Sequence, residues 1–95
     1  MAKTLEDVKE YYIELVEDPD VFDEGRRNDD AVNLCIFCHC LGLDIMAEFD
    51  KLAVKYKWDL RQYAKAREHV ERVIPYLNRW GERGTIQAMT YAINY

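Results

Sequence analysis

One apolar segment, residues 31–43, constrains the fold of this chain more than any other feature. It carries no charged side chain, and Asn33 and His39 are its only strongly polar residues. A helix that is apolar on all sides has no face for solvent, so other elements must surround it. The segment is also shorter than the roughly 20 residues that a membrane crossing needs. We therefore expect a buried central helix over about residues 30–41.

The length and composition fit one globular domain that covers residues 1–95. Hydrophobic residues make up 49% of the chain and charged residues 33%, a balance typical of folded rather than disordered proteins. With two prolines and four glycines, long stretches remain free of helix breakers, and no strand-like alternation is present. The prediction is an all-α fold, a compact bundle of four to five short helices around the central one.

Capping residues mark where the predicted helices begin. Thr4 precedes a periodic stretch over 4–18, and a threonine side-chain oxygen can accept a hydrogen bond from a free amide of the first turn. Asp44 and Asp59 have the same property and are expected to cap the third and fourth helices.

Proline and glycine mark where the predicted helices end. Pro19 should end the first helix, and Gly42 followed by Leu43 should end the central one in a left-handed C-terminal turn. Pro75 is expected to kink or break the fourth helix, with a last short helix over about 85–93. Helical spacing places the following residues on buried faces: Leu5, Val8, Tyr11, Tyr12, Ile13, Leu15 and Val16 in the first helix, and Leu60, Tyr63, Ala64, Val70, Val73, Ile74 and Leu77 in the fourth.

Charge is distributed unevenly along the chain. The net charge is −5, but residues 1–50 hold 14 acids and 4 bases, whereas residues 51–95 hold 4 acids and 9 bases. Two interpretations are open. The two halves can pack together and partly neutralise each other, or one of them can serve as a docking surface for a charged partner.

The main functional hypothesis is a small acidic protein-binding module, an inhibitor or regulator of a macromolecule with a basic surface. Its acids would steer the partner electrostatically, and exposed aromatic side chains would supply affinity. Bacterial and phage inhibitor or immunity proteins share this size, charge and helical character, which is an analogy of type only. The expected acidic contacts are Glu10, Glu14, Glu17, Asp20, Asp23 and Glu24, and the aromatic ones are Tyr11, Tyr76, Trp80, Tyr91 and Tyr95.

Two alternatives use other residues. A basic stripe on the third and fourth helices could neutralise nucleic-acid phosphates, although the sequence pI near 5.0 favours this less. A zinc-stabilised module could use Cys35, Cys38 and His39, which share one side of the central helix while Cys40 points away. Buried cysteines that pack as small hydrophobic residues are the simpler interpretation. The stripe comprises Lys51, Lys55, Arg61, Lys65, Arg72 and Arg79.

No motif indicates an enzyme or a cofactor. The start of the chain turns acidic at once and lacks the apolar region of a signal peptide, and no segment predicts a membrane partner. The three cysteines lie close together in one segment, unlike a secreted disulfide framework. We therefore expect a non-enzymatic, cytoplasmic protein.

Overall fold

Four α-helices make up the described part of the chain. The structure is a computed structural model that describes the backbone of residues 4–94 and the side chains of residues 4–77. Over these residues it contains no strand, so the predicted all-α fold is confirmed. None of the described helices combines the length and apolar character that a membrane crossing requires. The helices are α1 (Leu5–Glu17), α2 (Arg27–Leu41), α3 (Ile45–Lys55) and α4 (Leu60–Asn94).

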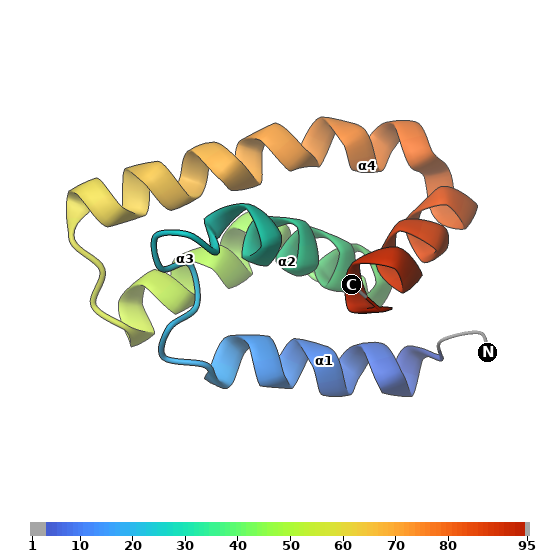
Figure 1. Cartoon of the computed structure of the whole chain (residues 1–95), viewed down its shortest axis with the longest axis horizontal. Helices are drawn as coiled ribbons and strands as arrows, with labels where there is room; N and C mark the ends of the chain where they lie inside the picture. The colour runs from blue at the N-terminus through green and yellow to red at the C-terminus, as the bar shows by residue number, and fades with distance from the viewer. Residues whose placement is uncertain (1–3, 95) are drawn as a thin grey trace.

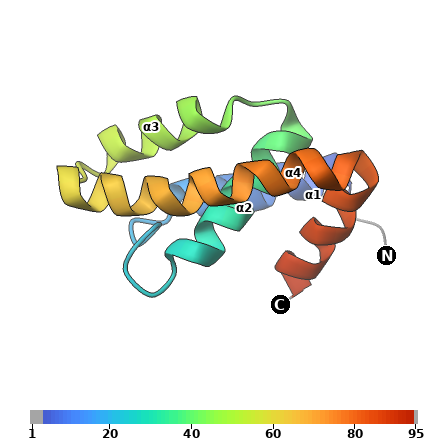
Figure 2. The same ribbon diagram turned by 90° about the horizontal axis from the view of Figure 1, so that it is seen from above.

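Helix α2 lies in the middle of the molecule and contacts each of the other three helices. It runs between α1 and the first part of α4, which cover opposite sides of it (Figure 1). Seen from above, α3 lies to one side of α4 (Figure 2). Five consecutive residues of α2, from Leu34 to Cys38, are buried. Because five residues exceed one turn of about 3.6 residues, no side of this stretch faces solvent, and the predicted buried central helix is confirmed.

The predicted N-caps are all present. The Thr4 hydroxyl accepts a hydrogen bond from the Asp7 amide at 3.2 Å, and the Asp7 carboxylate accepts one from the Thr4 amide at 3.0 Å. This reciprocal pair is a capping box. The carboxylates of Asp44 and Asp59 accept first-turn amide hydrogen bonds of α3 at 3.0 Å and of α4 at 2.7 Å. Local side-chain chemistry therefore starts three of the four helices.

The helix ends also follow local rules. Helix α1 ends shortly before Pro19, as predicted. Gly42 has a left-handed backbone with φ of 71°. Its amide donates to the carbonyl of His39 at 3.4 Å, and the Leu43 amide donates to the carbonyl of Cys38 at 2.8 Å. These are the two hydrogen bonds of a Schellman ending, so α2 stops where its sequence indicates.

Helix α4 differs from the prediction in its length. It passes through Pro75 without a break and is 35 residues long, so the expected separate helix over 85–93 does not form. Its ribbon instead bends within the continuous helix, where the colour turns from orange to red (Figure 1). The expected burial of Leu60 is wrong, because its side chain is 87% exposed. At about 100° per residue, Leu60 lies to one side of the buried row that contains Ala66 and Val70.

An aromatic cluster closes the end of the bundle where α4 begins. Phe22, from the loop between α1 and α2, packs edge-on against Phe49 of α3 and Trp58, with ring centroids 5.4 and 5.6 Å apart. Phe49 also contacts Tyr63 of α4 at 5.3 Å. Phe22 is fully buried although its φ of 62° lies in the left-handed region. Such a backbone costs about 1–3 kcal/mol for a bulky residue, so the surrounding contacts must hold it in place.

Candidate functional site: an acidic face on α1 and the following loop

The outer side of α1 carries a row of carboxylates. Val8 and Leu15 are buried and so fix which side of the helix faces α2. Glu10, Glu14 and Glu17 recur at spacings of three and four residues, and all three are exposed. The predicted row therefore exists on one helix surface.

The loop over 18–26 extends this negative surface. Asp20 and Glu24 are exposed and Asp23 is half-buried. Between Leu5 and Arg26 the chain holds nine acids and only two bases. We call the set of six predicted acids on α1 and this loop the acidic face: Glu10, Glu14, Glu17, Asp20, Asp23 and Glu24.

None of the side chains that the structure describes forms an ion pair with the acidic face. Within residues 4–77 the ion pairs join Arg26 to Asp18 and Asp30, Lys51 to Glu48, and Arg67 to Glu71. None of these pairs includes an acid of the acidic face. Among the described side chains only the Lys51–Glu48 pair joins the two halves, and these residues lie three positions apart on α3. Ion pairs between distant parts of the two halves are therefore absent from residues 4–77.

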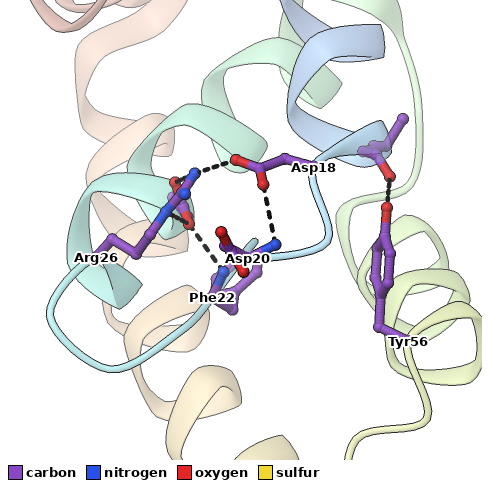
Figure 3. A network of polar contacts seen from close by, with 7 residues as sticks. Asp18, Asp20, Phe22, Arg26 and Tyr56 are labelled. Carbon is purple, nitrogen blue, oxygen red and sulfur yellow. Dashed lines mark hydrogen bonds and ion pairs between the residues drawn. The ribbon is translucent and has the colours of Figure 1, made fainter.

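A buried carboxylate holds the loop in its shape. Asp30, at the start of α2 and only 4% exposed, accepts hydrogen bonds from the Phe22 amide at 2.8 Å and from the Arg26 Nε at 2.9 Å. Arg26 also reaches the Asp18 carboxylate at 2.7 Å (Figure 3). The amide of Asp20 and then the guanidinium of Arg26 lower the pKa of Asp18 below its ordinary value. This network fixes the loop and with it three acids of the acidic face.

Polar contacts with α3 and the residue that follows it hold α1 in place. The Tyr12 hydroxyl donates to the Glu48 carboxylate at 2.5 Å, which lowers the pKa of Glu48 and, together with burial, raises that of Tyr12. At the end of α1, the Val16 carbonyl accepts from the Tyr56 hydroxyl at 2.6 Å (Figure 3) and from the Lys55 ammonium at 3.1 Å. A cation at a helix C-terminus is favourable for the helix dipole. These contacts hold the second half of α1, the part that carries Glu14 and Glu17.

A shallow pocket of about 360 Å³ opens beside the acidic face. Helix α1 contributes Tyr11 and Glu14, the loop contributes Asp18 and Arg26, and α2 contributes Asn33 among other residues. Sequence analysis did not find this pocket. Its walls come from three separate segments, and the spacing of residues along the chain does not predict that Tyr11 and Asn33 line the same pocket.

The predicted aromatic contacts divide into three groups. Tyr11 is half-buried and stacks on Phe37, with ring centroids 6.3 Å apart and planes 22° from parallel. Tyr76 is 49% exposed, but it lies on α4, away from the acidic face. The last group, Trp80, Tyr91 and Tyr95, lies outside the residues whose side chains the structure describes.

The predicted basic stripe is only partly available. Arg61, Lys65 and Arg72 are exposed on the outer side of α4, where they share the helix surface with Glu68. Two lysines on α3 are engaged, because Lys51 pairs with Glu48 at 3.1 Å and Lys55 bonds the end of α1. The side chain of Arg79 lies outside the described residues.

The three predicted zinc ligands do not come together. Cys35 and Cys38 are fully buried, and burial raises the pKa of each thiol to about 12, so both are protonated at neutral pH. His39 is exposed, which separates its ring from the two sulfurs. Among the described side chains, no group of three His, Cys, Asp or Glu residues is placed to hold a metal ion. The cysteines pack as small core residues, as the simpler interpretation expects.

No family model, curated protein or solved structure matches this chain. The fold and the site thus define a class only, that of small all-α modules with a charged helix face.

Proposed function

We propose that the chain is a binding module that docks a protein with a basic surface through its acidic face and so regulates or blocks that partner. The observation that carries this proposal is the absence of any ion pair between the acidic face and other side chains in residues 4–77. A surface carboxylate that is not paired with a neighbouring cation attracts an approaching basic partner more strongly than a paired one does. A surface of one sign can raise association rates by about 10- to 1,000-fold at low salt.

An exposed apolar side chain within the acidic face supports docking rather than mere solubility. Ile13 was expected to be buried but is 42% exposed, and it lies at the edge of the glutamate row of α1, one turn from Glu10 and Glu17. Interfaces commonly combine a small apolar centre with a charged rim, since apolar burial supplies affinity and charge supplies orientation. Ile13 would supply an apolar contact next to the charged row in such an interface.

Affinity capture from an extract of the native host tests the proposal. Wild-type chain and the variant Glu10→Lys/Glu17→Lys serve as baits, and captured proteins are quantified by mass spectrometry. We expect the wild type to enrich a basic protein. The amount of this protein captured by the variant should be lower by a factor of at least about ten. The matched control, Arg61→Glu/Arg72→Glu, reverses two charges on the opposite side of the bundle and should capture the same protein. Equal capture by the wild type and the α1 variant would count against the acidic face.

Nucleic-acid binding through α4 is the second candidate. The exposure of Arg61, Lys65 and Arg72 on one side of that helix favours it, and the acid Glu68 on the same side weakens it. The same pair of variants separates the two candidates. Binding to duplex DNA that falls steeply with salt and is lost in Arg61→Glu/Arg72→Glu alone would favour this second function.

A further inference from the structure

We infer that the pocket beside the acidic face accepts an arginine side chain of the protein that docks there. The inference deepens the proposed function and rests on it, since it names the part of the partner that the surface recognises. The pocket measures about 360 Å³ and lies between α1, the loop over 18–26 and α2. This volume is at the low end of the about 300–1,000 Å³ typical of small-molecule sites, and an inserted side chain is a suitable occupant.

The charge of the pocket walls favours a cation. Glu14, Asp18 and Asp30 line the pocket together with one cation, Arg26. That cation is already held by two of the three carboxylates, at 2.7 Å from Asp18 and 2.9 Å from Asp30. Glu14 is exposed and makes no ion pair with another described side chain. The walls therefore keep an excess of negative charge, which attracts a basic side chain and repels phosphate.

The apolar part of the pocket favours arginine over lysine. Tyr11 and Phe37 both line it and stack on each other, and because Phe37 is buried, the half-buried Tyr11 ring is the aromatic surface nearer to solvent. A guanidinium is planar and weakly hydrated, so it can stack on an aromatic ring and still form two parallel hydrogen bonds with one carboxylate. A lysine ammonium is a compact, strongly hydrated charge and gains less from this combination. Asn33 on the α2 side adds an amide oxygen that can accept a further hydrogen bond.

Two capped pentapeptides, Gly-Gly-Arg-Gly-Gly and Gly-Gly-Lys-Gly-Gly, test the inference by titration into the ¹⁵N-labelled full chain at constant ionic strength. We expect the arginine peptide to shift the amide signals around Asn33 and Leu15, and to saturate at a concentration at least threefold lower than the lysine peptide. Glu14→Gln should weaken the arginine peptide by at least threefold. Glu10→Gln is the matched control, because it removes the same charge one turn away and should leave binding unchanged.

Three results overturn the inference. The first is equal binding of the two peptides, the second is an equal effect of Glu14→Gln and Glu10→Gln, and the third is the absence of shifts around Asn33. In each case the capture experiment with Glu10→Lys/Glu17→Lys still reports on docking through the acidic face. Conversely, the arginine peptide could bind in the pocket while the variant Glu10→Lys/Glu17→Lys captures the partner as well as the wild type does. That result would refute docking through the acidic face but would support the pocket as an arginine site. The two failures are thus distinguishable.

Discussion

Replacing Asp30 by alanine should destabilise the protein far more than replacing its neighbour Asp29. The two aspartates look equivalent in the sequence, since both lie in the first turn of α2, where a negative charge is favourable. They differ in what they contact. Asp30 is 4% exposed and bonds both Phe22 and Arg26, whereas Asp29 is exposed.

The expected loss can be assembled from these contacts. The Phe22 amide belongs to a fully buried residue and would lose its acceptor, which costs about 1–3 kcal/mol. The Arg26 side chain is 39% exposed and still pairs with Asp18 in the variant. Losing its ion pair with Asp30 therefore costs only about 0.5–1 kcal/mol after screening by solvent. The helix-dipole contribution is the same for both aspartates and cancels in the comparison. Asp30→Ala should thus be less stable than Asp29→Ala by about 1.5–4 kcal/mol.

Urea unfolding followed by circular dichroism at 222 nm measures this difference. With an m-value of about 1.5 kcal/mol/M for a domain of this size, the midpoint of Asp30→Ala should lie about 1–2.7 M below that of Asp29→Ala. If Asp30→Ala does not fold, Asp30→Asn replaces it, because its amide oxygen can still accept from Phe22 and should preserve part of the stability. Coincident midpoints for the variants at positions 29 and 30 would refute the role given to the buried carboxylate.

Three further predictions concern the thiols, the pH dependence and the end of α2. Iodoacetamide should alkylate Cys40, which is half-buried, faster than Cys35 or Cys38 in the folded protein, and all three equally in denaturant, as intact mass spectrometry would show. Because the folded pKa of Glu48 is lowered, its stabilising effect is complete above the ordinary value of about 4.5 and is lost as the pH falls through the folded pKa. Acid unfolding curves should therefore fall less steeply below pH 4.5 for Glu48→Gln than for the wild type, and identical slopes would contradict this. Gly42→Ala should cost roughly 1 kcal/mol in urea unfolding through backbone strain alone, since no atom lies within 4 Å of the added methyl, and Gly42→Asn should cost less.

Local rules predicted most of the helix boundaries because the deciding interactions lie within a few residues of each other. Thr4 and Asp7 form their capping box across three positions, and Gly42 supplies the left-handed turn that few other residues tolerate. The buried central helix followed from its uncharged composition. The start of α2 was predicted at about residue 30 and lies at Arg27, because its N-cap residue, Arg26, makes no side-chain cap bond that the sequence could reveal. There the boundary depends on tertiary contacts.

The acidic face was predictable because its members lie close together in the sequence, on one helix and in the loop that follows it. Glu10, Glu14 and Glu17 follow from spacing alone. The pocket could not be foreseen, because Tyr11 and Asn33 reach it from different helices. The exposure of Ile13 was missed for a related reason, since a helical wheel shows which residues are adjacent but not how wide a strip the neighbouring helix covers.

The layered order of α1, α2 and α4 has a consequence for how the molecule meets other macromolecules. The acidic face of α1 and the exposed bases Arg61, Lys65 and Arg72 of α4 lie on opposite sides of a body whose extents are 39 × 25 × 23 Å. Charges distributed in this way produce a torque on the protein in the field of a charged macromolecule, so the protein reorients before contact. This effect acts within about 10 Å, the Debye length at 0.1 M salt.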